Sequence, residues 1–375
     1  MSRVRVLIVD DSVVVRRMLT DILGSEPWIE VVGTAANGNI GLQKLTQVNP
    51  DLVTLDVEMP ERDGLSTLTE IRKTHPKLPV IMFSTLTERA ATTTLEALSR
   101  GATDYATKPQ GTTGIVAASA DVKAQLLPKI RALFPKAGAS TTSLLPQGLS
   151  KPPAATPRAA EPRRERQKPA VLAIGCSTGG PNALATIFGA LPTLPVPIVL
   201  TQHMPPLFTR MLADRLSAHS AIRVIEAAGG ETLEAGCAYI APGDHHMVLA
   251  RKGAAIVTAL NQGPPENSCR PAVDPMFRSV VAAYDGAVLG VVLTGMGQDG
   301  LHGCHAIREA GGQIIVQDEA TSVVWGMPGF VARAGIADGV LPLEAIAAEI
   351  VRRVGTGAAQ RALAGAVSHQ RLGAP

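Results

Sequence analysis

Short runs of aliphatic residues alternate with amphipathic stretches over the first 135 or so residues. The runs predicted as strands are VRVLIVDD, WIEVVGTAAN, DLVTLDVEMP, PVIMFST and ATDYATKP. Stretches with apolar residues at helical spacing lie between them, and the first helix is predicted to begin after Ser12 as its N-cap. Strands that alternate with helices in this way predict an open, doubly wound parallel α/β sheet.

The same pattern resumes at Pro169 and continues to about Val354. Its strongest predicted strands are AVLAIGCS, PIVLTQHMP, AVLGVVLTGMG and GQIIVQDE, with shorter ones in CAYIAPGDHHMVLA and AAIVTAL. We therefore expect a second α/β domain over residues 169–355. Residues 136–168 are rich in Pro, Ala and Arg and nearly lack large hydrophobic side chains, which predicts a flexible linker. The Gly/Ala-rich residues 356–375 are predicted to form a flexible tail.

Composition narrows the class of protein. Hydrophobic residues make up 46% of the chain but aromatic residues only 3%, so the cores must be aliphatic. A net charge of +3 is too small to indicate nucleic-acid binding. The four cysteines have no metal-site spacing and are expected to be reduced, most of them in the core. Without a signal peptide or a run of about 20 apolar residues, we expect a cytoplasmic protein with no membrane insertion.

Polar side chains stand at the ends of the predicted strands of the first domain. They are Asp10, Asp11, Asp56, Ser84 and Lys108. The carboxyl ends of parallel strands share one rim, where three carboxylates would repel one another unless a cation such as Mg²⁺ lay between them. Lys108 offers a positive charge to a phosphate oxygen and Ser84 a hydroxyl donor. This set predicts phosphorylation of a carboxylate, with Asp56 as the acceptor.

These residues lie in motifs that resemble the response-regulator receiver family. The motifs are VDD, LDVEMPERDG, FST and TKP, and the resemblance covers residues 1–135. It implies a flavodoxin-like fold and phosphorylation of Asp56 by a partner histidine kinase. It also implies that Asp11 and Asp56 hold Mg²⁺ with help from Asp10. Ser84 and Lys108 would sense the phosphoryl group.

A glycine-rich turn, GCSTGG, follows the first strand of the second domain and precedes a helix. This context is typical of a nucleophile elbow that exposes Ser177 near a helix N-terminus. A phosphate-binding loop is the rival interpretation, but the full G-x-G-x-x-G and G-K-[ST] patterns are missing. His203 and Asp299 also follow predicted strands, so we expect them at the same rim as base and orienting acid. The N–H of Met296, between two glycines, is expected to help hold an oxyanion.

The order Ser, His, Asp differs from the Ser, Asp, His order of α/β-hydrolases, so that superfamily is not assigned. The segments IGCSTGGP, QHMP, APGDHHM, CRPAVDPMFRS and LTGMGQDG instead resemble the catalytic domain of chemotaxis protein-glutamate methylesterases. The resemblance implies a Rossmann-like domain with Ser177, His203 and Asp299 as the triad, Met296 at the oxyanion and Thr178 nearby. It further implies demethylation, and slower deamidation, of methyl-accepting chemoreceptors without a cofactor for the ester reaction.

Two other classes of function compete with the esterase. The second domain could be a binding module without catalysis, although no helix-turn-helix motif points to DNA. An oxidoreductase is disfavoured because the dinucleotide fingerprint is missing. Arg270, Asp274 and Arg278 could position an acidic substrate, or could form a structural ion-pair network.

Overall fold

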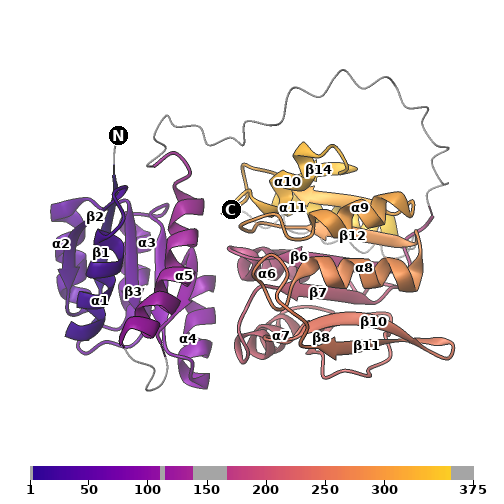
Figure 1. The fold of residues 1–375 in the computed structure, drawn as a ribbon, viewed down its shortest axis with the longest axis horizontal. Coiled ribbons are helices and arrows are strands. Elements are labelled where there is room, and N and C mark those ends of the chain that lie inside the picture. Colours follow the sequence, from indigo (N-terminus) through magenta and orange to yellow (C-terminus); the bar gives the residue numbers. More distant parts are fainter. Residues whose placement is uncertain (1–2, 110–114, 138–166, 356–375) are drawn as a thin grey trace, which may run out of the picture.

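The computed structural model describes residues 3–109, 115–137 and 167–355. The predicted linker lies almost entirely outside these ranges, and the predicted tail lies wholly outside them. The described residues form two α/β domains, each built on a parallel sheet (Figure 1). This confirms the predicted fold class of two doubly wound parallel-sheet domains.

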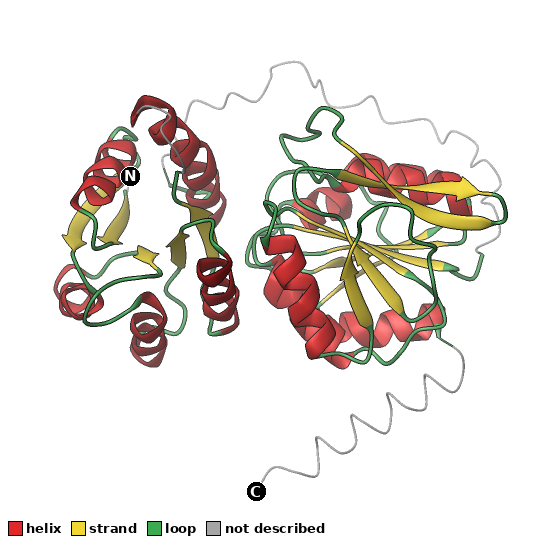
Figure 2. Cartoon of the chain, turned by 90° about the horizontal axis from the view of Figure 1, so that it is seen from below, coloured by secondary structure: helices red, strands yellow, loops and turns green. Residues whose placement is uncertain are grey.

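The first domain alternates strands and helices along the chain. Its strands are β1 (Val4–Val9), β2 (Ile29–Ala35), β3 (Leu52–Asp56), β4 (Val80–Ser84) and β5 (Asp104–Thr107). Its helices are α1 (Val13–Gly24), α2 (Gly38–Val48), α3 (Gly64–Thr74), α4 (Glu88–Ser99) and α5 (Ile115–Leu133). The strand order is β2-β1-β3-β4-β5, and each neighbouring pair is parallel. Helices α1 and α5 cover one face and α2, α3 and α4 the other (Figure 2). Ser12 caps α1 as predicted, because its side chain accepts a hydrogen bond from the Val15 N–H.

The second domain contains a seven-stranded sheet. Its strands are β6 (Val171–Cys176), β7 (Ile198–Gln202), β8 (Arg223–Glu226), β9 (Cys237–Ile240), β12 (Val288–Val292), β13 (Gln313–Gln317) and β14 (Gly339–Leu341). The helices are α6 (Gly180–Ala190), α7 (Phe208–Ala218), α8 (Val273–Tyr284), α9 (Leu301–Glu309), α10 (Met327–Arg333) and α11 (Leu343–Val354). The order is β14-β13-β12-β6-β7-β9-β8, again parallel throughout. A separate antiparallel hairpin joins β10 (His246–Lys252) to β11 (Ala255–Asn261).

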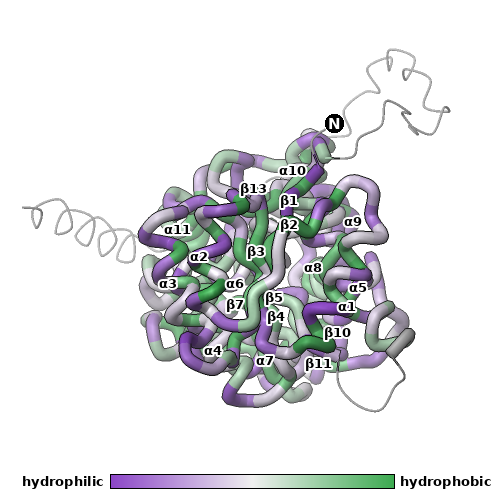
Figure 3. Tube along the Cα trace, turned by 90° about the vertical axis from the view of Figure 1, so that its left-hand side faces the viewer, coloured by the Kyte–Doolittle hydropathy of each residue, from purple (hydrophilic) through white to green (hydrophobic). Residues whose placement is uncertain are grey.

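Aliphatic side chains fill both cores, as the composition predicts. The central strands β3, β4, β6, β7 and β12 are buried at every position, which is the pattern of strands covered by helices on both faces. In the first domain, hydrophobic positions gather on inner strands such as β3, and hydrophilic positions on the outer helices and loops (Figure 3). Within the described residues, no helix is both long and apolar enough to cross a membrane.

The two domains touch through α4 of the first and α6 and α7 of the second. The side-chain amide of Asn182 on α6 donates a hydrogen bond to the carbonyl of Leu98 on α4 at 2.7 Å. The guanidinium of Arg215 on α7 donates to the carbonyl of Leu95 on α4 at 2.6 Å. These polar contacts fix how the first domain faces the second.

Candidate active site

Ser177 lies in a sharp turn between β6 and α6. Its N–H donates to the carbonyl of Thr294 at 3.0 Å, and the N–H of Gly180 donates back to the Ser177 carbonyl at 2.8 Å. Gly179 has φ of +79°, a left-handed conformation that favours glycine. A Cβ on Gly180 would lie 1.9 Å from the Gln202 side-chain oxygen, so the close approach of turn and β7 also requires glycine. The turn has the strand–turn–helix geometry expected of a nucleophile elbow.

His203 follows β7, the neighbour of β6, and its N–H donates to the Cys176 carbonyl at 3.1 Å. Its Nε2 lies 2.7 Å from Oδ2 of Asp299, and its side chain is 11% exposed. Burial by itself lowers the pKa of His203. The hydrogen bond with Asp299 and the contact with Cys269 outweigh burial and raise that pKa to about 10.

Asp299 is only 1% exposed and is surrounded by donors. Oδ2 accepts from the Val273 N–H at 2.6 Å as well as facing His203, and Oδ1 accepts from the N–H groups of Asp274 and Gly300 at 3.1 and 2.9 Å. Val273 and Asp274 open α8, so the carboxylate also occupies the positive end of that helix. Burial acts to raise the pKa of Asp299, but the hydrogen bond from His203 and these N–H groups lower it below its usual value.

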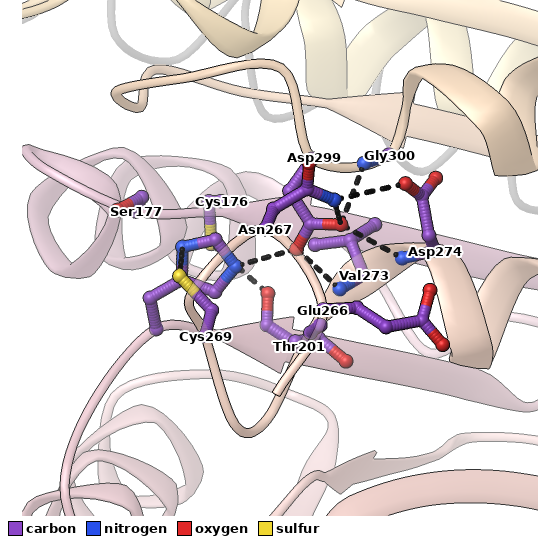
Figure 4. A network of polar contacts seen from close by, with 12 residues as sticks. Cys176, Ser177, Thr201, Glu266, Asn267, Cys269, Val273, Asp274, Asp299 and Gly300 are labelled. Carbon is purple, nitrogen blue, oxygen red and sulfur yellow. Dashed lines mark hydrogen bonds and ion pairs between the residues drawn. The ribbon is translucent and has the colours of Figure 1, made fainter. Parts of the chain in front are cut away.

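The three predicted triad residues thus stand at the carboxyl ends of adjacent strands, with two of them in direct contact. His203 turns Nε2 toward Asp299, which leaves Nδ1 as the nitrogen available to a serine. Nδ1 lies 3.4 Å from the sulfur of Cys269. Ser177 Oγ has no hydrogen-bond partner among the described residues, and Figure 4 shows Ser177 apart from the cluster around Asp299. The serine and the base are therefore near one another but are not hydrogen-bonded in this state.

Met296 and Thr178 flank the serine. The Met296 N–H has no acceptor within the described part of the chain, so it is free to bind an oxyanion. A Cβ on the preceding residue, Gly295, would lie 2.8 Å from the Ser177 Cβ, which explains the glycine there. The Thr178 hydroxyl donates to Oδ2 of Asp104 in the first domain at 2.7 Å. Thr178 therefore links the serine turn to the other domain.

Sequence reasoning missed two residues at this site. Asn267 donates hydrogen bonds from its side chain to Asp299 and Asp274 (Figure 4). The sulfur of Cys269 faces Nδ1 of His203. Cys176, Cys237 and Cys304 are buried, as expected of most cysteines here, but Cys269 is partly exposed. Asn267 lies in the polar stretch just before CRPAVDPMFRS, and Cys269 is the first residue of that motif, but only the tertiary structure reveals that both reach the site. Of the basic residues in that motif, Arg270 pairs with Asp244 and Arg278 with Glu266.

The rim of the first domain gathers the acidic residues predicted to meet there. Carboxylate oxygens of Asp10, Asp11 and Asp56 lie within 4.8 Å of one another. Nζ of Lys108 lies 2.9 Å from Asp10 and 2.8 Å from Asp56. Burial, together with the charge of Asp10, raises the pKa of Asp56 to about 6 in spite of the lysine. One lysine therefore does not balance these charges, and the all-oxygen donor set fits a hard divalent cation.

Ser84 has a different environment from Lys108. It is fully buried, its hydroxyl donates to the carbonyls of Thr85 and Ala90 at 3.2 and 3.4 Å, and it accepts from the Thr94 hydroxyl at 2.8 Å. Ala90 and Thr94 belong to α4, so in this state the Ser84 hydroxyl is engaged by α4.

The first domain also lies beside the histidine. A cleft of about 350 Å³ between the domains is lined by Tyr105 and Lys129 on one side and by His203 and Cys269 on the other. The ring of Tyr105 stacks on Phe208 of α7, with ring centres 4.7 Å apart and an angle of 8°. The first domain is therefore packed against the edge of the candidate active site.

Comparison with known proteins places these features in families. Residues 6–120 match the response regulator receiver domain, and residues 172–350 match the CheB methylesterase family. The protein-glutamate methylesterase/protein-glutamine glutaminase of Trichodesmium erythraeum is 52% identical over 356 residues, which cover 95% of this chain and all of that protein. A protein of the same description from Nocardioides is 49% identical over 369 residues, covering 98% of this chain and all of that protein.

Among solved structures, the crystal structure of the Thermotoga maritima CheB methylesterase catalytic domain is 41% identical. It covers 50% of this chain and 99% of its own, with a TM-score of 0.48. Family matches in both domains and high identity over nearly the whole length agree. The chain belongs to the protein-glutamate methylesterase/protein-glutamine glutaminase family of chemotaxis response regulators.

Proposed function

We propose that this chain hydrolyses glutamyl methyl esters on methyl-accepting chemoreceptors, and more slowly deamidates receptor glutamines, under control of its receiver domain. We assign the receiver to residues 1–135, a linker to 136–168, the catalytic domain to 169–355 and a tail to 356–375. The observation that carries the proposal is the buried Asp299–His203 pair next to a serine on a nucleophile elbow. That arrangement fits nucleophilic acyl transfer.

In the proposed reaction, Ser177 Oγ attacks the ester carbonyl while Nδ1 of His203 takes its proton. Asp299 keeps the proton on Nε2 and stabilises the imidazolium. The carbonyl oxygen becomes an oxyanion that the free Met296 N–H binds, a type of contact worth about 3–4 kcal/mol in other serine enzymes. The imidazolium then protonates the departing methoxide, which leaves as methanol. Water, deprotonated by His203, releases the glutamate and restores Ser177, with Thr178 supporting the serine turn.

The arrangement described above fits a resting state of this enzyme. A histidine with a pKa near 10 stays protonated at neutral pH, whereas a general base works best with a pKa near the operating pH. Its Nδ1 also faces Cys269 instead of Ser177. We infer that activation moves Nδ1 away from Cys269, which frees it for Ser177 and removes one of the contacts that raise the pKa of His203.

The receiver supplies the control in this proposal. Asp11 and Asp56, assisted by Asp10, would hold Mg²⁺, which would neutralise the rim while Asp56 accepts a phosphoryl group from a histidine kinase. Lys108 would bind the phosphoryl oxygens. Rotation of Ser84 toward the phosphoryl group would break its hydrogen bonds with α4, the helix that contacts α7. The receiver would then undock and open the cleft beside His203.

The test is methanol release from methylated chemoreceptor membranes, with and without acetyl phosphate. We expect release to rise with the phosphodonor and to vanish in Ser177→Ala, while Asp56 is still phosphorylated in that variant. Full release by Ser177→Ala would remove the serine from the mechanism. If phosphorylated wild-type protein released no methanol, the rival function, a receptor-binding module without catalysis, would be favoured.

A further inference from the structure

A two-residue turn reaches from the chain after β11 to the candidate active site. The backbone groups of Glu266 and Cys269 exchange hydrogen bonds at 3.1 and 2.9 Å. The two residues between them, Asn267 and Ser268, have φ of +52° and +62°. Turns with positive φ at both central positions favour asparagine at the first, so the backbone accounts for the residue type at 267. The backbone does not account for what its side chain contacts.

The turn is tied to the domain on both sides. The carboxylate of Glu266 pairs with Arg278 on α8 at 2.6 and 3.0 Å. The buried ring of His246 contacts the Pro264 carbonyl at 3.0 Å and accepts from the Ala272 N–H at 3.2 Å. These anchors hold the turn over the point where α8 and α9 begin.

The Asn267 side chain lies between two buried carboxylates (Figure 4). Nδ2 donates to Oδ1 of Asp299 at 3.0 Å and to Oδ2 of Asp274 at 3.1 Å, so each amide hydrogen has its own acceptor. The reverse orientation of the amide would place its oxygen against both carboxylate oxygens. Chemistry therefore fixes which end of the amide faces inward.

Asp274 also connects α8 to α9. Its backbone N–H donates to Asp299 at 3.1 Å, and its Oδ1 accepts from the Gly303 N–H in the first turn of α9 at 2.7 Å. Asp274 is 1% exposed, and burial together with the charge of Asp299 raises its pKa. Asp274 and Asp299 thus place two buried carboxylates close together, and Asn267 is the side-chain amide that they share.

We propose that Asn267 is a positioning residue for the esterase: its side-chain amide, braced against Asp274, holds Asp299 in the orientation that faces His203 and favours its ionised form. The inference rests on the proposed catalytic role of Asp299 and His203. Without the amide, Asp299 loses a donor, and no side-chain amide lies between its carboxylate and that of Asp274. The Asp299–His203 pair would then bind its shared proton more tightly.

Two substitutions separate this role from a purely structural one. Asn267→Gly accepts the positive φ without strain, and Asn267→Asp keeps the shape of the side chain but replaces a donor with a negative charge. A residue needed only for the turn would tolerate both. The proposal expects kcat for methanol release from phosphorylated full-length protein to fall about 10- to 100-fold in Asn267→Gly and further in Asn267→Asp, with KM little changed.

The pH profile gives a second reading. Several titratable and charged groups surround the Asp299–His203 pair. They are Cys269 on the turn, Asp274 and Arg278 on α8, His302 on α9 and, from the receiver side of the cleft, Lys129. All of them are unchanged in the Asn267 variants. The acidic limb of the pH profile of kcat should therefore move to higher pH, by about one unit in Asn267→Gly and more in Asn267→Asp.

Glu266→Gln is the matched control, because it removes the charge of Glu266 but keeps an oxygen that can accept from Arg278, so the turn stays anchored and Asn267 stays in place. It should keep the wild-type rate and pH profile. NMR titration of His203 in the full-length variants tests the same shift without any turnover. An unchanged His203 pKa in both Asn267 variants, or wild-type kcat and profile in Asn267→Gly, would overturn the proposal. Loss of Ser177-dependent release in the wild type would overturn the proposed function instead, and the NMR result would still decide the role of Asn267.

Discussion

Removing the carboxylate of Asp104 should weaken the docking of the receiver domain on the catalytic domain of the resting enzyme. Asp104 is 5% exposed and lies in β5. Its Oδ2 accepts from the Thr178 hydroxyl of the catalytic domain, and its Oδ1 lies 2.8 Å from Nζ of Lys129 within the receiver. Asp104→Ala removes the hydrogen bond with Thr178 and leaves every catalytic-domain residue unchanged.

The size of the effect follows from that one bond. A hydrogen bond to a charged group contributes about 1.5–3 kcal/mol, and each 1.4 kcal/mol is a factor of ten in an equilibrium constant. The ratio of docked to undocked protein should fall about 10- to 100-fold. The stacking of Tyr105 on Phe208 and the bond from Arg215 to α4 remain, so docking is weakened and not abolished.

The assay is methanol release by unphosphorylated full-length protein. Asp104→Ala should raise this basal rate up to the point where the undocked form predominates, and the activation by acetyl phosphate should shrink by the same factor. Asp104→Asn can still form a neutral hydrogen bond and should give a smaller rise. Glu70→Ala is the control, since it removes a receiver carboxylate whose partner is Lys73 on the same helix. If Asp104→Ala leaves basal activity as unchanged as Glu70→Ala does, the docking argument is refuted.

Three further predictions concern the two sites. Gly295→Ala should lower kcat at least about 10-fold with receiver phosphorylation intact, because its Cβ would lie 2.4 Å from the Met327 sulfur and 2.8 Å from the Ser177 Cβ. Because folding raises the pKa of Asp56 from 3.8 to about 6, the native state binds more protons between these pH values and loses stability as pH rises through them. Thermal unfolding at pH 8 should show Asp56→Asn more stable by up to about 3 kcal/mol, and an unchanged or lower midpoint would contradict this. Cys269→Ala should lower the pKa of His203, moving the acidic limb of kcat to lower pH; an unmoved limb would show that the thiol does not contribute.

The sequence predicts the buried strands of both sheets because a strand covered on both faces leaves a continuous aliphatic run. The edge strands β8 and β14 carry no such signal: they have four and three residues and are partly exposed, and neither was predicted. The rim residues of the receiver could be predicted for a related reason. Each follows a strong strand, and parallel topology brings strand ends together.

Contacts made by loops and between domains were beyond that reasoning. Asn267 reaches Asp299 only because a turn is anchored by Arg278 and His246, which lie on other elements. The bond between Thr178 and Asp104 depends on how two separately folded domains dock, and no periodicity encodes that. Local patterns specify elements, whereas these contacts arise from packing between them.

The order of the strands explains how a Ser, His, Asp sequence can build this site on a parallel sheet. The chain leaves β6 toward β7 and β9 on one side, then returns to β12 on the other, so β6 lies where the direction of winding reverses. Ser177 follows β6, His203 follows β7 and Asp299 follows β12, the two neighbours of the central strand. Loops diverge above such a switch point and leave a crevice, into which residues from both sides can reach. His203 and Asp299 meet there at 2.7 Å although their strands lie on opposite sides of β6. The order of the proposed triad along the chain is therefore a consequence of the topology, and the proposed chemistry needs only that base and acid flank the serine.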